Sequence, residues 1–253
     1  MAINRMSQIK VFPNIKSLSQ AALEEFIALA NDSIRRRGRF SVSLAGGSTP
    51  QTLYQRLAYP DYQAQVDWNK VHFFWGDERH VPPGHPDSNF RMVHESLIRK
   101  IPIPGSNVNR VPAEMEVKEA ALRYEVVLRD FFYGYWPQFD LVLLGMGSDG
   151  HTASLFPHSE GLKEESRWFI ANFAPKSEEW RLTLSKNAIN AARNIIIIVS
   201  GEEKAGTLAK VLEGEHRPDE MPIQLVSPNK GILIWMIDEN AASKLHQGGS
   251  YKP

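Results

Sequence analysis

The chain has no cysteine among its 253 residues. This absence excludes disulfide bonds, a thiolate nucleophile and a cysteine-based zinc site. Net charge is lacking as well, because 29 Lys and Arg residues balance 29 Asp and Glu residues. A neutral chain has no overall field to attract nucleic acid or an anionic membrane, so we expect neither as a partner. A protein without cysteine also fits the cytoplasm, where we expect it.

Long apolar runs are the third absence. The longest, from Ile232 to Ile237, is far too short to cross a bilayer, and residues 1–14 lack the apolar segment of a signal peptide. Hydrophobic residues nevertheless make up 42% of the chain, enough for a substantial core. We find no internal repeat or linker, which favours a single domain over residues 1–253 with a flexible tail at 247–253.

Apolar runs alternate with helical periodicities along the chain. Strands are expected at 9–12, 40–44, 71–75, 108–111, 139–144, 168–173, 181–184, 195–199 and 232–237. Two helices are expected to begin at serine caps: one runs from Ser19 to Gly38 and the other from Ser88 to 98. Further helices are expected at 51–57, at 114–132, near 188, and from the segment 201–204 to 212. This alternation predicts an α/β fold with a largely parallel sheet and helices on both faces, although the strand count also allows a closed (β/α)8 barrel.

The most informative stretch is DLVLLGMGSDGHTASLFP at 140–157. A buried strand ends there in glycines, with Asp149 and His151 among them, and open α/β sheets bind their ligands at such strand ends. An imidazole can accept and return a proton near neutral pH, so His151 is the best candidate for proton transfer, and Asp149 could fix its tautomer. The alternative is that Asp149 caps a short helix beside a packed His151. The glycines and the strand end favour the chemical interpretation.

The glycines at 145, 147 and 150 also fit the dinucleotide-binding pattern. That pattern requires an acidic residue about 20 positions later, at the end of the next strand. The segment 169–172 contains none. A nicotinamide enzyme therefore ranks low, and we expect no cofactor.

A second glycine loop follows the strand predicted at 40–44. It offers backbone N–H groups and hydroxyls just before a helix, an arrangement that binds phosphate, through Gly46, Gly47, Ser48 and Thr49. It is not a Walker loop, because no Lys-Ser/Thr pair follows. A tight turn with Thr49 as helix cap is an equally good interpretation of this loop alone. Arg79, Arg181 and Lys204 could supply positive charge, although each is otherwise an ordinary surface cation.

Acidic and imidazole side chains cluster between positions 77 and 87. Asp77, His80, His85 and Asp87 do not have the spacing of a helical ligand pair, and their loop is rich in proline. Solvated loop residues are the better interpretation. We therefore expect no metal site.

Several motifs together carry a family resemblance. LAGGSTP at 44–50, FFWGDERHVP at 73–82 with DSNFRM at 87–92, and LLGMGSDGHTASLFP at 143–157 resemble the 6-phosphogluconolactonase family. That family belongs to a superfamily shared with glucosamine-6-phosphate isomerase/deaminase. RLTL at 181–184, SGEEK at 200–204 and PIQLVSP at 222–228 follow in the expected order, so the resemblance covers nearly the whole chain.

The resemblance implies a Rossmann-like α/β fold and hydrolysis of 6-phospho-D-glucono-1,5-lactone, the second step of the oxidative pentose phosphate pathway, without a cofactor. By motif match, His151 would be the general base, Asp149 its orienting partner, and Arg79 a residue that positions His151 or the substrate. The phosphate-binding positions of the superfamily map onto Gly46, Gly47, Ser48, Thr49, Arg181 and Lys204.

Two alternatives remain. The deaminases of the superfamily carry a glutamate five positions beyond the histidine, where this chain has Phe156, and a tyrosine after Asp-Glu, where it has Arg79. Without that acid, amine chemistry loses a proton carrier, so a lactonase is favoured. A phosphosugar-binding regulator without catalysis is the second alternative, and the presence of Asp149 and His151 argues against it. For the oligomeric state we favour a monomer.

Overall fold

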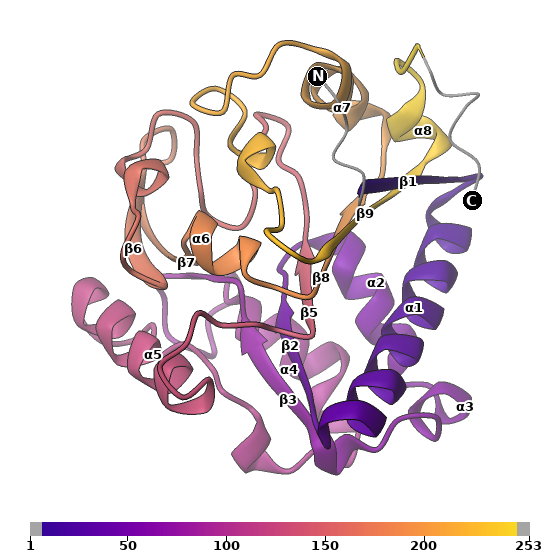
Figure 1. The fold of residues 1–253 in the computed structure, drawn as a ribbon, viewed down its shortest axis with the longest axis vertical. Coiled ribbons are helices and arrows are strands. Elements are labelled where there is room, and N and C mark those ends of the chain that lie inside the picture. The colour runs from indigo at the N-terminus through magenta and orange to yellow at the C-terminus, as the bar shows by residue number, and fades with distance from the viewer. Residues whose placement is uncertain (1–6, 247–253) are drawn as a thin grey trace.

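The computed structural model describes residues 7–246, so the predicted tail at 247–253 lies outside the described residues. A six-stranded, fully parallel sheet forms its centre (Figure 1). In spatial order its strands are β1 (Ser7–Phe12), β9 (Ile232–Asp238), β8 (Asn194–Val199), β5 (Leu141–Leu144), β2 (Phe40–Leu44) and β3 (Val71–Trp75). The prediction of a parallel α/β sheet is confirmed. The sheet is open rather than closed, so the barrel alternative is wrong.

Helices flank this sheet. They are α1 (Ile15–Arg37), α2 (Ser48–Leu57), α3 (Pro60–Gln63), α4 (Asn89–Ser96), α5 (Val117–Phe131), α6 (Lys186–Asn190), α7 (Ala205–Glu213) and α8 (Glu239–Ala242). The long α1 packs against β1, β2 and β9, because its apolar residues recur on one face and most of that face is buried. Within residues 7–246, none of the helices has both the length and the apolar content that a bilayer span requires.

A second, antiparallel sheet stands beside the first. It contains β4 (Asp77–Arg79), β7 (Glu179–Leu184) and β6 (Phe169–Ala174), in that order. The strands predicted at 168–173 and 181–184 are thus confirmed, but they lie outside the parallel sheet. The chain passes from β3 through Gly76 directly into β4, so the two sheets are joined at the end of β3. In Figure 1, β6 and β7 lie on the side of the molecule where α5 packs.

Two sequence predictions about element boundaries are wrong. The N-cap of α1 is Asn14, whose side chain accepts a hydrogen bond from the Ser17 N–H at 3.0 Å, whereas the predicted cap, Ser19, is buried inside the helix. The strand predicted at 108–111 is reduced to one bridge between Val108 and Phe73. Two other signals are confirmed: α1 ends at Gly38, whose φ of 74° is left-handed, and Ser88 caps α4.

The strand order contains a reversal that positions the functional loops. From β2 the chain continues to β3 on one side, and from β5 it continues to β8 on the other, although β2 and β5 are hydrogen-bonded neighbours. Loops that leave neighbouring strands in opposite directions open a crevice at the carboxyl ends of those strands. The loops at 45–50 and 145–151 are therefore brought together despite their separation in sequence.

A buried carboxylate joins α5 to the antiparallel sheet. Glu125 accepts hydrogen bonds from Arg129 on its own helix and, at 2.6 Å, from Arg167 just before β6. We expect Glu125→Ala to lower the free energy of unfolding by about 2 kcal/mol, measured in urea, because two charged hydrogen-bonded groups lose their acceptor. Glu119→Ala, at an exposed site on the same helix, should change it by less than about 0.5 kcal/mol. Equal effects of the two substitutions would contradict this role for Glu125.

Candidate active site

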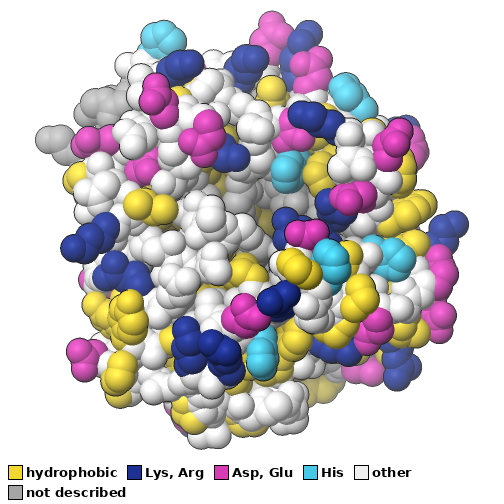
Figure 2. Space-filling model, turned by 180° about the vertical axis from the view of Figure 1, so that it is seen from behind, with side chains coloured by type: hydrophobic (Ala, Val, Ile, Leu, Met, Phe, Trp, Pro, Cys, Tyr) yellow, Lys and Arg dark blue, Asp and Glu magenta, His cyan; other side chains and the backbone are white. Residues whose placement is uncertain are grey.

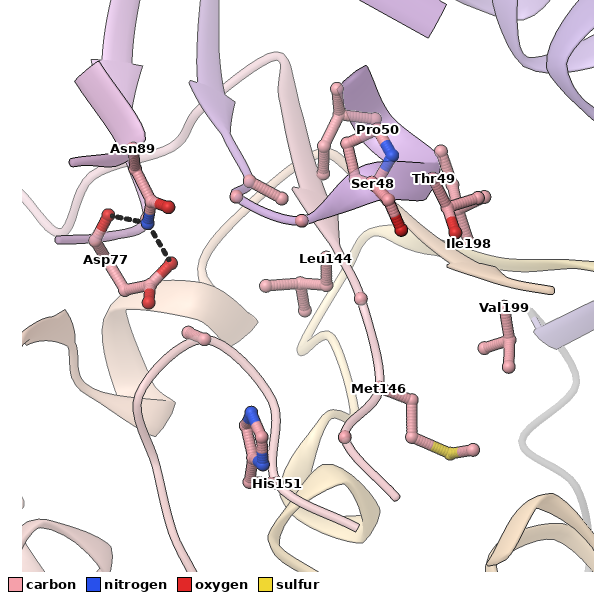
Figure 3. A pocket seen from close by; sticks show the side chains of 18 of the residues that line it. Ser48, Thr49, Pro50, Asp77, Asn89, Leu144, Met146, His151, Ile198 and Val199 are labelled. Atoms are coloured by element: carbon pink, nitrogen blue, oxygen red, sulfur yellow. Dashed lines mark hydrogen bonds between the residues drawn. The ribbon is translucent and has the colours of Figure 1, made fainter. Parts of the chain in front are cut away.

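Loops from the carboxyl ends of four parallel strands enclose one cleft of about 240 Å³. These loops contribute 45–50 after β2, 76–79 after β3, 145–151 after β5 and 198–204 around the end of β8. Figure 3 shows the His151 ring on one side of this cleft, with Ser48 and Thr49 across it. The imidazole and the glycine loop therefore border the same space. On the face seen in Figure 2, Lys and Arg side chains are interspersed with Asp and Glu.

The loop after β2 leads directly into α2. Gly47 is the N-cap, with a φ of 96° that favours glycine, and no side chain of the described residues caps the first turn. The interpretation of Thr49 as the cap is therefore wrong. A Cβ at Gly46 would overlap the side-chain amide of Asn89, so this position needs glycine as well. Uncapped N–H groups at the positive end of a helix form a site for an anion such as phosphate.

Tyr54 of α2 fixes this loop to the end of β2. Its buried hydroxyl accepts a hydrogen bond from the Ala45 N–H at 3.0 Å and donates one to the Ala45 carbonyl at 2.9 Å. Burial raises the pKa of the Tyr54 hydroxyl, which keeps it protonated as a donor. The backbone that begins the glycine loop is thus held from within the core.

The loop after β5 presents a His–Asp pair. The Nδ1 atom of His151 lies 2.5 Å from Oδ1 of Asp149, which also accepts the His151 backbone N–H at 3.2 Å. A carboxylate can only accept, so Nδ1 carries the proton and Nε2 of the neutral ring is left as a base. The hydrogen bond from His151 lowers the pKa of Asp149 to about 2, so this carboxyl is ionised throughout the neutral range. Asp149 is thus suited to orient the ring.

Glycine is required beside this pair. A Cβ at Gly147 would overlap Nδ1 of His151 and would come within 2.6 Å of Oδ1 of Asp149. The Gly147 N–H donates to the His151 carbonyl at 2.8 Å, which closes the loop on itself. The Gly150 carbonyl accepts a hydrogen bond from the Ile223 N–H at 3.0 Å. The segment around Ile223 therefore supports the loop that carries the pair.

The lowered pKa of Asp149 predicts how the stability of the protein depends on pH. Its pKa is below the ordinary value of 3.8, so its contribution to stability is complete above that value and is lost as the pH falls through about 2. We expect the difference in unfolding free energy between the unchanged protein and Asp149→Asn to persist down to about pH 4 and to shrink as the pH falls from there towards 2. Urea unfolding at a series of pH values measures this. A difference that disappears already at pH 6 would contradict the pairing.

Arg79 enters the cleft from the end of β4. Its guanidinium donates to Oδ1 of Asn89 and, at 3.3 Å, to the Asp87 carbonyl. The Asn89 amide in turn donates to the Asp77 carbonyl at 2.9 Å and to Oδ1 of Asp77 at 3.3 Å, as the dashed lines in Figure 3 show. The Arg79 side chain is therefore fixed by a buried network that links β4 to the start of α4.

The preceding residue, Glu78, completes this link. Its buried carboxylate accepts the backbone N–H groups of Arg79 at 2.8 Å, Asn89 at 2.7 Å and Phe90 at 2.7 Å. Burial raises the pKa of Glu78 despite these donors. Sequence reasoning did not single out Glu78 or Asn89. Both residues lie in motifs of the family resemblance, Glu78 in FFWGDERHVP at 73–82 and Asn89 in DSNFRM at 87–92.

Lys204 reaches the cleft from a short 3-10 turn after β8. The turn is held by the buried Asp238 at the end of β9, which accepts hydrogen bonds from the Ser200 hydroxyl at 2.5 Å and the Gly201 N–H at 3.1 Å. The same carboxylate caps α8 through the Ala241 N–H. The end of β9 thus fixes the turn that brings Lys204 into the same cleft as the start of α2.

Arg181 lies in a different place. It lines an adjoining hollow of about 570 Å³, whose border with the cleft is formed by Gly47, Arg79 and Asn89. Its guanidinium is 2.6 Å from Oε2 of Glu179, with which it forms an ion pair. The structure therefore gathers Arg79, His151, Lys204 and residues 46–49 in one cleft, with Asp149 behind His151, and leaves Arg181 next to it.

Among residues 7–246, no three His, Asp or Glu side chains gather as a metal-ligand set.

Comparison with known proteins identifies the family. The family described as glucosamine-6-phosphate isomerases/6-phosphogluconolactonase matches residues 13–235. The chain belongs to this family. Proteins of the family share the α/β fold found here: the structure of 6-phosphogluconolactonase from Trypanosoma cruzi is similar with a TM-score of 0.85 and 28% identity, over 97% of this chain and 98% of that one.

Relatives named 6-phosphogluconolactonase match almost end to end. The protein from Synechocystis sp. is 37% identical over 242 residues, which is 94% of this chain and 98% of the relative. The one from Nostoc sp. is 36% identical over 241 residues, with the same coverage of both chains. A monomeric glucosamine-6-phosphate deaminase is also similar in structure, with a TM-score of 0.79 over 94% of this chain and 99% of that one, but at 20% identity it shows only the common fold.

Proposed function

We propose that the protein hydrolyses 6-phospho-D-glucono-1,5-lactone to 6-phospho-D-gluconate, in the oxidative pentose phosphate pathway. One observation carries the proposal: a His–Asp pair and an uncapped helix start open onto the same cleft. The family and the names of its relatives support the choice of substrate. The proposal includes no cofactor and keeps the sequence expectations of a single-domain, monomeric and cytoplasmic protein.

The proposed reaction begins with water at the lactone carbonyl carbon, C1. Nε2 of His151 takes a proton from the water as its oxygen bonds to C1, and Asp149 stabilises the imidazolium that forms. When the tetrahedral intermediate collapses, the bond between C1 and the ring oxygen breaks, and His151 returns the proton to that oxygen. The product is the open-chain acid, and the imidazole is neutral again.

The negative charge on the carbonyl oxygen needs a donor. The Gly147 N–H is already used by the His151 carbonyl, so it is not available to the intermediate. Arg79 borders the cleft and is held by Asn89 and Asp87, so its guanidinium is fixed before the substrate arrives. We assign the charge-stabilising role to Arg79, since donors that need no reorganisation are the most effective.

The phosphate of the substrate would bind at the start of α2. The N–H groups beyond Gly47 and the ammonium of Lys204 face the same cleft, and both attract a dianion. Held there, the phosphate anchors the sugar so that C1 meets His151, which converts binding energy into orientation.

The neighbour of His151 favours a lactonase over a deaminase. The Phe156 ring lies 4.7 Å from the imidazole, centre to centre, in the position where the resemblance places a glutamate in the deaminases. An apolar ring cannot carry a proton to or from an amine. Phe156 therefore supports hydrolysis as the reaction of this cleft.

A pH-controlled assay with the lactone, corrected for its spontaneous hydrolysis, tests the proposal. We expect enzymatic turnover of the lactone and no ammonia release from glucosamine 6-phosphate. Ammonia release without lactone turnover would favour the deaminase. Binding of 6-phosphogluconate without any turnover would favour a regulator.

A further inference from the structure

Two arginines are paired on adjacent strands of the antiparallel sheet. Arg79 on β4 and Arg181 on β7 are direct partners in the strand register, and both line the hollow that adjoins the cleft. Like charges directly opposite each other on a sheet are unfavourable. This pair therefore needs negative charge in the hollow, and what supplies that charge decides how readily an anion binds.

Only one of the two is balanced by a carboxylate among the described residues. Arg79 is held by neutral acceptors, the Asn89 amide oxygen and the Asp87 carbonyl. Arg181 is bound by Glu179, two positions earlier on the same strand, with 2.6 Å between Nη2 and Oε2. The hydrogen bond and charge of Arg181, together with the charge of Arg79, lower the pKa of Glu179, so the carboxylate is ionised where a ligand anion would compete with it.

The exposure of Glu179 and Arg181 differs in a way that allows a ligand anion to replace Glu179. The Glu179 side chain is 58% exposed, so it can return to water at little cost, whereas the Arg181 side chain is only 16% exposed and stays in the hollow. Gly47 borders both the hollow and the cleft, so a phosphate at the start of α2 lies on the border that Arg181 faces. A guanidinium released from Glu179 can bind such a phosphate through two parallel hydrogen bonds.

We propose that Glu179 sets the affinity of the site for phosphorylated ligands, by occupying Arg181 until a phosphate dianion displaces it. The inference rests on the proposed function in taking the ligand to be a phosphosugar. A dianion at the helix start competes well for Arg181, whereas a neutral sugar or a single carboxylate competes poorly. Glu179 thus reduces the affinity for every anion that binds through Arg181.

Binding of inorganic phosphate and of 6-phosphogluconate, measured by calorimetry, tests this directly. For Glu179→Gln we expect about two- to fivefold tighter binding of both, the range that an exposed ion pair is worth, with a lower KM for the lactone and an unchanged kcat. Glu160→Gln is the matched control, because it removes an exposed carboxylate that pairs with Lys163 outside both the cleft and the hollow. It should leave binding unchanged.

A second background separates competition from a general change of charge. In Arg181→Ala, adding Glu179→Gln should no longer tighten binding, because the guanidinium that Glu179 binds is gone. Weaker or unchanged binding in Glu179→Gln alone would overturn the proposal, since Glu179 would then hold Arg181 ready for the phosphate rather than away from it. If the unchanged protein shows no lactone turnover but Glu179→Gln still binds phosphate more tightly, the proposed function fails and the role of Glu179 stands.

Discussion

Replacing His151 with alanine should lower kcat for the lactone by about 10²–10⁴-fold and leave KM nearly unchanged. The imidazole is the only base that the proposed reaction uses, and Asp149 already fixes its Nδ1 proton so that Nε2 is free to act. The phosphate would bind on the other side of the cleft, at the start of α2, where the substitution changes nothing. Steady-state kinetics at a controlled pH separate the two effects.

The matched control for this experiment is His216→Ala. His216 is exposed in the segment after α7 and does not line the cleft, so its loss should leave both kcat and KM unchanged. A His151→Ala variant with normal kcat would remove this residue from the mechanism. A loss confined to KM would instead make His151 a binding residue.

The second large effect is expected from a single added methyl group. In Gly147→Ala, the new Cβ would overlap Nδ1 of His151 and crowd Asp149, so the pair must move or separate. A misplacement of about 1 Å in a catalytic group typically costs about 100-fold in rate, and we expect at least that loss in kcat. Since the cleft is at the surface, the melting temperature should fall by only a few degrees.

Gly105→Ala provides the comparison. A Cβ at Gly105 would have no atom within 4 Å, so this substitution adds the same methyl group where nothing is displaced. Activity and melting temperature should remain those of the unchanged protein. If Gly147→Ala retained full activity, the contact between Gly147 and the His–Asp pair would be irrelevant to the reaction. If it failed to fold, the pair could be probed instead with Asp149→Asn, which keeps the number of heavy atoms unchanged.

The architecture and the location of the site could be predicted because both depend on local patterns. Apolar runs that end in glycine and polar residues mark the strand ends, and the carboxyl ends of parallel strands lie at one edge of the sheet. His151 and residues 46–49 follow two such runs and do border one cleft. The start of α1 differs from the predicted one because Ser19 is as good a cap as Asn14 in sequence, and only the buried environment of Ser19 decides between them.

The partners of the charged residues could not be predicted, because they come from strands and helices far apart in the chain. Arg181 resembles a phosphate-binding residue in sequence, but the register of β7 against β4 and the position of Glu179 determine where its guanidinium lies. The role of Asn89 could not be predicted for the same reason, since it depends on contact with Gly46 and Arg79. Such contacts follow from tertiary packing and not from any short pattern.

The pairing of β1 with β9 has a consequence for how the molecule is made. Ser7 lies opposite Leu233, and Asp238 at the end of β9 holds the turn that carries Lys204. During translation, β1 leaves the ribosome early but cannot pair with β9 until nearly all of the chain has been synthesised. Neither the pairing of β1 nor the turn that carries Lys204 can be completed before then. Nascent chains halted ahead of residue 232 should therefore remain inactive and prone to associate through the bare edge of β8.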